Sequence, residues 1–155
     1  MNSQLKESLV YQGKEVAMAC EPLNQYFARL KSPPRFYTGL KANKRGYLGR
    51  WAIIKNELHL TKLIGLLENN EEITLDHLFP GKQNVFAEWF NGEIVLNQGK
   101  LIALKSENIP AIYEKDLHLE FINGMLTNTY IVENALDQTS SFNDNIPSGS
   151  TSNPS

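Results

Sequence analysis

Cysteine is almost absent from this chain of 155 residues, which contains Cys20 alone. One cysteine excludes an internal disulfide and a zinc site built on several thiolates. We expect Cys20, in the segment EVAMAC, to be a small buried apolar residue and not a nucleophile. The sequence predicts no metal site and no cofactor.

Long hydrophobic runs are missing as well. No apolar run reaches the roughly 18 residues that a membrane-spanning helix needs. The first segment, MNSQLKESLVYQGK, lacks the charged-then-apolar pattern and the small-residue cleavage site of a secretory signal. Hydrophobic residues make up 41% of the chain and charged residues 21%, as in soluble globular proteins. We therefore expect a cytoplasmic protein that does not bind membranes.

Acidic residues are missing between Pro22 and Asn56, although the whole chain has a net charge of −2. That stretch interleaves aromatic residues with eight basic ones: Arg29, Lys31, Arg35, Lys41, Lys44, Arg45, Arg50 and Lys55. From Glu57 to Asn134 the balance reverses, with twelve acidic and five basic residues. One half of the sequence is therefore strongly positive and the other is about as negative.

The charge separation has three interpretations. The positive half binds phosphates while its aromatic rings stack on bases, or it pairs with the negative half across one sheet, or it binds an acidic protein surface. The pI near 5.9 disfavours nucleic acid, because dedicated nucleic-acid domains are usually basic as a whole. A protein partner tolerates a neutral total. On this basis the sequence predicts a partner-binding site at Arg35, Lys41, Lys44, Arg45 and Tyr47.

Large apolar residues are scarce from Asp137 onward, where the sequence is DQTSSFNDNIPSGSTSNPS. Such a segment cannot bury enough surface to offset the entropy of ordering it. We expect residues 137–155 to be a disordered polar tail. Residues 1–136 are expected to form one β-rich domain.

Short alternating segments separated by turns dominate those residues, which favours strands. SLVYQ and EVAMAC flank Gly13-Lys14 and predict an opening hairpin. Three later turn pairs, Lys55-Asn56, Asn91-Gly92 and Asn123-Gly124, each lie between two apolar strand ends, and Asn-Gly is the strongest short hairpin signal. The pattern predicts a mainly β fold, an antiparallel meander rolled or closed into a barrel-like sheet.

One short α-helix of about residues 22–31 is expected to pack on this sheet. Pro22 suits a first helical turn, and Leu23, Phe27 and Leu30 share one helical face. The strand YLGRWAII, residues 47–54, is apolar on both faces, so we expect it to be central and covered on both sides. A single helical turn is predicted between Thr74 and Pro80.

Catalytic and metal-binding patterns are weak. His59 and His118 recur in the similar settings ELHL and DLHL, beside Glu57 and Asp116, but no two histidines have the close in-sequence spacing of metal ligands. A small enzyme would need polar groups to converge on one cavity of the rolled sheet, such as His59, His118, Glu88 and Tyr113. No nucleophile-type turn and no phosphate loop is present in the sequence. Enzymatic activity is therefore the alternative and not the leading hypothesis.

The segments RGYLGRWAI…LHL and LFPGKQNVFAEWFNGEIVL resemble a family of small uncharacterised bacterial proteins. The matching residues, within residues 9–133, are Arg45, Gly46, Tyr47, Trp51, Leu58, Leu60, Leu78, Phe79, Pro80, Ala87, Trp89, Phe90 and Gly92. The resemblance implies a bacterial, cytoplasmic, single-domain protein and no particular chemistry.

The leading hypothesis is a non-catalytic protein-interaction domain, of an immunity or regulatory type, that binds an acidic protein surface. The first alternative is an enzyme or ligand-binding protein with a pocket in the rolled sheet. The second is nucleic-acid binding through the acid-free segment 22–56. The identity of the partner and the oligomeric state stay open.

Overall fold

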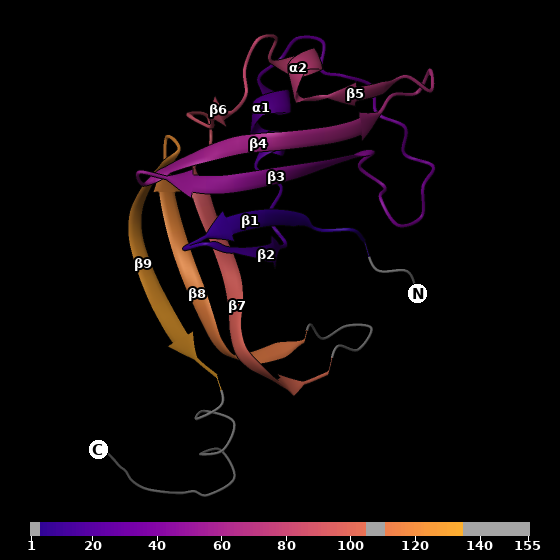
Figure 1. The fold of residues 1–155 in the computed structure, drawn as a ribbon. Coiled ribbons are helices and arrows are strands. Elements are labelled where there is room, and N and C mark those ends of the chain that lie inside the picture. Colours follow the sequence, from indigo (N-terminus) through magenta and orange to yellow (C-terminus); the bar gives the residue numbers. More distant parts are fainter. Residues whose placement is uncertain (1–3, 105–110, 135–155) are drawn as a thin grey trace, which may run out of the picture. The chain divides into compact units, whose positions relative to one another are not determined.

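A computed structural model describes residues 4–104 and 111–134, which fall into two compact units (Figure 1). Unit 1 contains the chain up to Val95 together with Leu119–Thr129, and unit 2 contains Leu96–His118 and the chain from Tyr130. The tail predicted for residues 137–155 lies outside the described residues. A single domain over residues 1–136 stays a prediction.

The fold is mainly β with two short helices, as the sequence predicts. The elements in chain order are β1 Glu7–Tyr11, β2 Lys14–Met18, α1 Leu23–Ala28, β3 Tyr47–Ile54, β4 Glu57–Leu66, β5 Glu72–Thr74, α2 Leu75–Leu78, β6 Val85–Phe86, β7 Gly92–Ala103, β8 Ile112–Ile122 and β9 Met125–Glu133.

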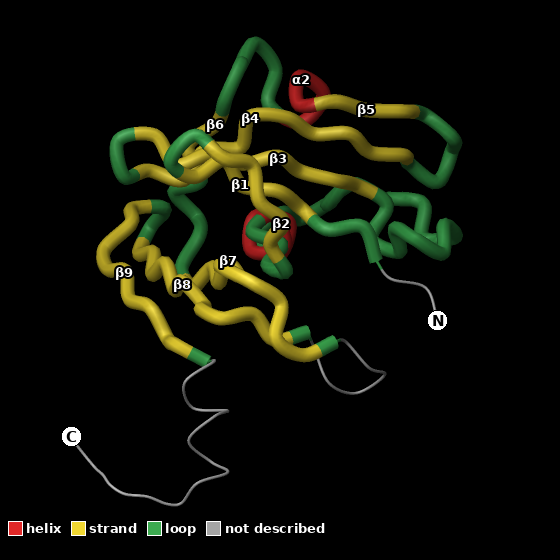
Figure 2. Tube along the Cα trace, turned by 60° about the horizontal axis from the view of Figure 1, so that its bottom comes forward, coloured by secondary structure: helices red, strands yellow, loops and turns green. Residues whose placement is uncertain are grey.

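The sheet is open and mixed. Its strands follow the order β2-β1-β3-β4-β9-β8-β7, with β5 and β6 also paired to β4. The expected closure into a barrel is therefore not observed. The expectation of a purely antiparallel sheet is wrong as well, because β1 and β3 are parallel. Parallel neighbours need a crossover of a dozen or more residues, and the chain between Tyr11 and Tyr47, which includes β2 and α1, provides it. Figure 2 shows β1, β3, β4 and β5 side by side.

Local turn chemistry forms two of the three predicted hairpins. Lys55 and Asn56 have φ of 52° and 65° and join β3 to β4, whereas Asn123 and Gly124 have φ of 50° and 79° and join β8 to β9. Positive φ at both central residues is what a type I′ turn requires. The opening hairpin also forms, with Tyr11 opposite Lys14.

The third hairpin, at Asn91-Gly92, is not formed. Strand β6 ends at Phe86 and β7 begins at Gly92, so no strand precedes the turn directly. Asn91 is held by two other segments instead. Its N–H donates to Gln25 Oε1 at 2.9 Å, and its Oδ1 accepts the Asn123 N–H at 2.9 Å. These tertiary hydrogen bonds determine the conformation of Asn91 in place of the local Asn-Gly preference.

Helix α1 packs against the rest of unit 1 through aromatic rings. Leu23 is fully buried, and Phe27 contacts the rings of Phe36 and Tyr47 at 5.5 Å each. The Trp89 Nε1–H donates to the Pro22 carbonyl at 2.9 Å at the start of the helix. The helix is therefore shorter than the predicted 22–31 but uses the predicted face. Helix α2 confirms the expected helical turn, although the Thr74 side chain makes no capping hydrogen bond.

Only one face of β3 is covered, which corrects the expectation of cover on both sides. Tyr47, Gly49 and Trp51 point inward and are buried. Leu48 and Arg50 lie on the opposite face, which is half-buried to exposed. Helix α1 covers the inward face, because its Phe27 ring contacts the ring of Tyr47, which lies on that face.

Strand β4 contains a β-bulge. Arg50 pairs with Lys62 and Trp51 with Leu60, so Thr61 is the extra residue. The Thr61 hydroxyl donates to the Arg50 carbonyl at 3.0 Å. A bulge shifts which residues face the core. Here Lys62 is brought to the exposed face.

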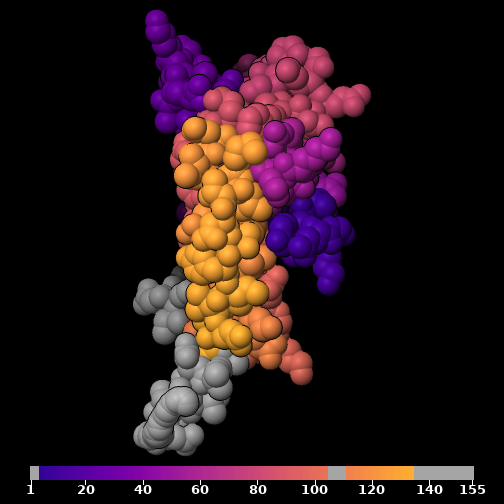
Figure 3. Space-filling model, turned by 90° about the vertical axis from the view of Figure 1, so that its left-hand side faces the viewer, coloured from indigo at the N-terminus to yellow at the C-terminus, as the bar shows by residue number. Residues whose placement is uncertain are grey.

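Strand β8 shows the predicted two-faced alternation, with Leu117, Leu119 and Phe121 buried. Strand β9 is different, because every residue except Leu126 is exposed. Figure 3 shows β9, in yellow-orange, uncovered on that side of the molecule. In unit 2, Asn134 donates to the Tyr113 carbonyl and to Asp116, which fastens the end of β9 to β8.

Candidate functional site

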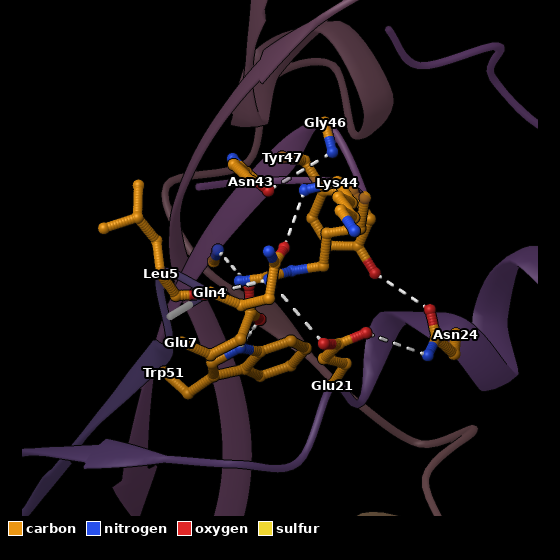
Figure 4. A network of polar contacts seen from close by, with 12 residues as sticks. Gln4, Leu5, Glu7, Glu21, Asn24, Asn43, Lys44, Gly46, Tyr47 and Trp51 are labelled. Carbon is orange, nitrogen blue, oxygen red and sulfur yellow. Dashed lines mark hydrogen bonds and ion pairs between the residues drawn. The ribbon is translucent and has the colours of Figure 1, made fainter. Parts of the chain in front are cut away.

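A carboxylate is buried at the start of β1, on the inward face of the sheet in unit 1. The Glu7 side chain is fully enclosed, and it accepts three hydrogen bonds (Figure 4). Oε1 accepts the Trp51 Nε1–H at 2.8 Å, and Oε2 accepts the Gly49 N–H at 2.6 Å and an Arg45 Nη2–H at 3.1 Å. Burial raises the pKa of Glu7, while the contacts with Trp51, Gly49 and Arg45 oppose that rise.

The Arg45 side chain folds inward to meet this carboxylate. It is 12% exposed, and its Nη1 donates to the Leu5 carbonyl at 3.0 Å and lies 3.6 Å from a Glu21 carboxylate oxygen. Its guanidinium carbon lies 5.5 Å from the centroid of the Tyr47 ring. Arg45 therefore links residues 5–7 to residue 21 and to β3.

The network continues to helix α1. The Tyr47 hydroxyl donates to Asn24 Oδ1 at 3.0 Å, and Asn24 Nδ2 donates to Glu21 Oε1 at 3.2 Å. Burial, with a smaller effect of the Glu7 and Glu21 charges, raises the pKa of the Tyr47 hydroxyl. The same causes raise the pKa of the Cys20 thiol to about 11. Neither group is prepared to act as a base or a nucleophile near neutral pH.

The buried network therefore positions the backbone of β3. Glycine is required at position 49, since a Cβ there would stand 2.7 Å from Glu7 Oε1 and 2.9 Å from Trp51 Nε1. Gly49 lies between Leu48 and Arg50, whose side chains leave the sheet on the opposite, exposed face. From the buried face of β3, Glu7 thus fixes the backbone of Gly49, which also belongs to a site on the exposed face.

That exposed site is a shallow pocket of about 230 Å³ on the outer face of unit 1. Strands β1 to β4 all contribute to its lining: Lys6, Ser8, Glu15, Leu48, Gly49, Arg50, Lys62 and Ile64. We call this surface the basic pocket. Three cations and one anion surround it, which gives a net charge of +2.

Strand register sets the arrangement of these side chains. Ser8, Arg50 and Lys62 are direct neighbours across β1, β3 and β4. Leu48 and Ile64 are direct neighbours two residues away along β3 and β4. The Ile64 side chain is 54% exposed, unusually open for an aliphatic residue within a sheet.

One acidic side chain already lies among the cations. Glu15 Oε1 is 3.3 Å from Arg50 Nη2, and Glu15 Oε2 accepts the Ser8 hydroxyl at 2.8 Å. Both charged side chains of the ion pair are about half exposed. Lys6 and Lys62 form no ion pair with any residue that the structure describes.

The five residues predicted to bind a partner do not form one surface group. Lys41 and Lys44 are exposed on a loop whose backbone bonds to Gln4 and Leu5. Arg35 is exposed and lies 3.7 Å from Glu68. Arg45 and Tyr47 belong to the buried network described above. Partner binding by the exposed members stays a prediction, whereas Arg45 and Tyr47 have structural contacts that account for them.

Each arginine of the acid-free segment forms an ion pair with an acidic side chain. Arg29 lies 3.2 Å from Glu88, and the acidic partners of Arg35, Arg45 and Arg50 are those given above. The aromatic rings of this segment mostly contact one another at tilted or edge-on angles, as Phe36 and Tyr47 do with ring centroids 4.9 Å apart. These contacts favour neutralisation across the fold over a platform for stacking bases.

The residues suggested for a catalytic cavity have separate partners. His59 bonds to Glu57 and Asn84, each at 3.0 Å. Glu88 pairs with Arg29, and His118 stacks on Tyr130 in unit 2 with ring centroids 4.5 Å apart. Nowhere in the described ranges do three or more His, Cys, Asp and Glu side chains form a group able to hold a metal ion.

Sequence reasoning missed Glu7 and most of the basic pocket. A usable signal for Glu7 was its position two residues before Leu9 on the same strand. Alternate residues of a strand share a face, and Leu9 is fully buried. Lys6 and Ser8 alternate with Glu7 and Leu9 along the chain and therefore face outward. Lys62 had no such signal, because its exposure depends on the bulge at Thr61.

Among residues 4–104 and 111–134, no helix combines the length and the apolar character needed to cross a bilayer. Comparison of the chain with protein-family models, with curated proteins and with solved structures gave no match. The resemblance noted from the sequence therefore stays a prediction.

Proposed function

We propose that this chain is a non-catalytic protein-interaction domain that binds an acidic segment of another protein at the basic pocket. The observation that supports this most is the location of three cations around the exposed Ile64 and the half-buried Leu48 on the outer face of unit 1. Charged groups of one sign attract and orient a partner of the opposite sign. Exposed aliphatic side chains add the apolar contact that a specific interface needs.

The neighbouring loop enlarges the positive surface. The Leu5 N–H donates to the Ala42 carbonyl, and Gln4 bonds to Lys41 and Lys44 backbone atoms at 2.7 and 2.8 Å. Residues 41–44 are thereby fastened beside the chain that leads directly into Lys6. An acidic partner that reaches beyond the pocket on this side would meet Lys41 and Lys44, two of the residues predicted from the sequence.

Rigidity of the backbone also supports a binding role. The Glu7 carboxylate holds Gly49 from the buried side, and the Thr61 hydroxyl holds the Arg50 carbonyl. Side chains on a fixed backbone lose less entropy on binding than side chains on a mobile loop. The backbone that carries Leu48, Arg50 and Lys62 is therefore held in place before a partner binds.

The test is titration of the full chain with labelled poly-L-glutamate, followed by fluorescence anisotropy. The double variant Lys6→Glu/Lys62→Glu should raise the dissociation constant at least tenfold. Each charge reversal replaces an attraction by a repulsion, each of about 1 kcal/mol at contact distance in water. The control Lys31→Glu/Lys82→Glu changes the same net charge at exposed lysines outside the pocket. It should weaken binding less than threefold.

Equal losses in the two double variants would show a non-specific charge effect and would overturn the proposal. A labelled single-stranded DNA oligonucleotide is the competing probe. Tighter binding of this DNA than of poly-L-glutamate at the same ionic strength would favour the nucleic-acid alternative, and its affinity would then fall steeply with salt. Circular dichroism of each variant checks that the fold is kept.

A further inference from the structure

We infer that the basic pocket recognises an extended segment in which an acidic and an apolar side chain stand two residues apart. This inference rests on the proposed function and specifies its ligand. It follows from the two rows of side chains in the pocket. The cationic row consists of Ser8, Arg50 and Lys62, and the apolar row consists of Leu48 and Ile64.

The spacing of the rows matches the spacing within an extended ligand. The rows are two residues apart along β3 and β4, and a strand rises about 3.3 Å per residue, so they are separated by roughly 7 Å. In an extended segment, two side chains two positions apart point to the same side, and they are also separated by roughly 7 Å. A ligand aligned with β3 can place a carboxylate over Arg50 and Lys62 while its apolar side chain covers Ile64.

Glu15 shows that a carboxylate fits the cationic row. In the free protein its two oxygens contact Arg50 and Ser8 at 3.3 and 2.8 Å. Exposed ion pairs of this kind contribute little stability, about 0–1 kcal/mol. An incoming carboxylate can therefore displace Glu15 at small cost. Glu15 acts as an internal competitor for the acidic position.

Lys6 precedes Ser8 by two residues and β1 runs parallel to β3, so Lys6 lies beside Leu48, level with the apolar row of the same pocket. The size of the pocket points to individual side chains as occupants. At about 230 Å³ it is smaller than the roughly 300–1,000 Å³ of sites that enclose a whole small molecule. The preferred ligand is thus an extended peptide with an acidic residue two positions from an apolar one.

Two labelled pentapeptides of equal composition test the spacing. Asp-Thr-Leu-Thr-Asp places both carboxylates and the leucine on one side of an extended chain, whereas Asp-Leu-Thr-Thr-Asp places the leucine on the other side from the first carboxylate. We expect the first peptide to bind at least fivefold more tightly by fluorescence anisotropy. Ile64→Ser, at an exposed position, should remove this preference. Glu15→Gln should tighten binding of the first peptide about threefold.

The outcomes separate the inference from the proposed function. Equal affinity for the two peptides, or binding of poly-L-glutamate without binding of either peptide, would overturn the spacing rule and leave the acidic-segment function standing. Absence of binding to all three probes would overturn both. A preference that survives in Ile64→Ser would show that the apolar row does not contact the leucine, which also contradicts the inference.

Discussion

Replacement of Glu7 by glutamine tests how the buried network stabilises unit 1. The substitution keeps the size of the side chain and removes its charge. One oxygen of the amide can still accept from Gly49 and Arg45, but the amide nitrogen then faces the Trp51 Nε1–H, which donates to Glu7 at 2.8 Å in the native chain. Two donors would stand opposite each other in a fully buried place.

The expected loss in the free energy of unfolding is about 3 kcal/mol. A buried donor left without an acceptor costs about 1–3 kcal/mol, and a hydrogen bond between charged groups, here with Arg45, contributes about 1.5–3 kcal/mol. Removal of one partner from a buried ion pair costs about 3–5 kcal/mol in general. We choose the low end because Arg45 keeps the Leu5 carbonyl and the Glu21 carboxylate as partners. The melting temperature should fall by about 10 °C.

Urea unfolding followed by tryptophan fluorescence measures this change, because Trp51 and Trp89 both belong to unit 1. Glu15→Gln is the matched control. It makes the same chemical change in an ion pair that is about half exposed, and it should cost less than about 1 kcal/mol. A Glu7→Gln loss no larger than that of the control would refute the reasoning that the Trp51 Nε1–H has no alternative acceptor.

Two further predictions concern ionisation in unit 1. Burial raises the folded-state pKa of Glu7 above its ordinary value of 4.5. As the pH rises, Glu7 therefore ionises in the unfolded chain before it ionises in the folded protein. The contribution of Glu7 to the free energy of unfolding is thus largest in acid and declines as the pH rises through the folded-state pKa. The stability deficit of Glu7→Gln, measured from pH 7 down to pH 4.5, should therefore not shrink, and a deficit that shrinks in acid would show a lowered pKa. The half-buried Cys20 thiol has a pKa of about 11. Iodoacetamide at pH 8 should therefore alkylate it about 100-fold more slowly in the folded protein than in urea. Equal rates, measured by mass spectrometry, would contradict the raised pKa.

Much of the fold was predictable because it depends on short-range chemistry. Asn56, Asn123 and Gly124 are residue types that readily adopt positive φ, so the hairpins at Lys55-Asn56 and Asn123-Gly124 follow largely from the turn residues themselves. The start of β3 at Tyr47 and the inward face of α1 follow equally from local patterns. At Asn91 the same kind of reasoning was wrong, because the partners that determine its conformation are Gln25 and Asn123.

The candidate site was much less predictable, because charge along the sequence does not show which charges meet in space. Arg45 appeared free in a segment without acidic residues, yet its carboxylate partners are Glu7 and Glu21. Lys62 belongs to the acidic half of the sequence, yet the bulge at Thr61 places it beside Arg50. The positive surface thus combines residues from both halves.

The sequence by itself determined that this protein is built mainly from strands, with tight turns at fixed positions and a short helix after Pro22, since periodicity and turn preference act over a few residues. Only the tertiary structure decided that the sheet is open and mixed, that Glu7 is enclosed by Arg45, Gly49 and Trp51, and that a basic pocket lies on the opposite face of β3. The physical reason is that the parallel pairing and the buried charge network join residues about 40 positions apart, and no local preference specifies such partners.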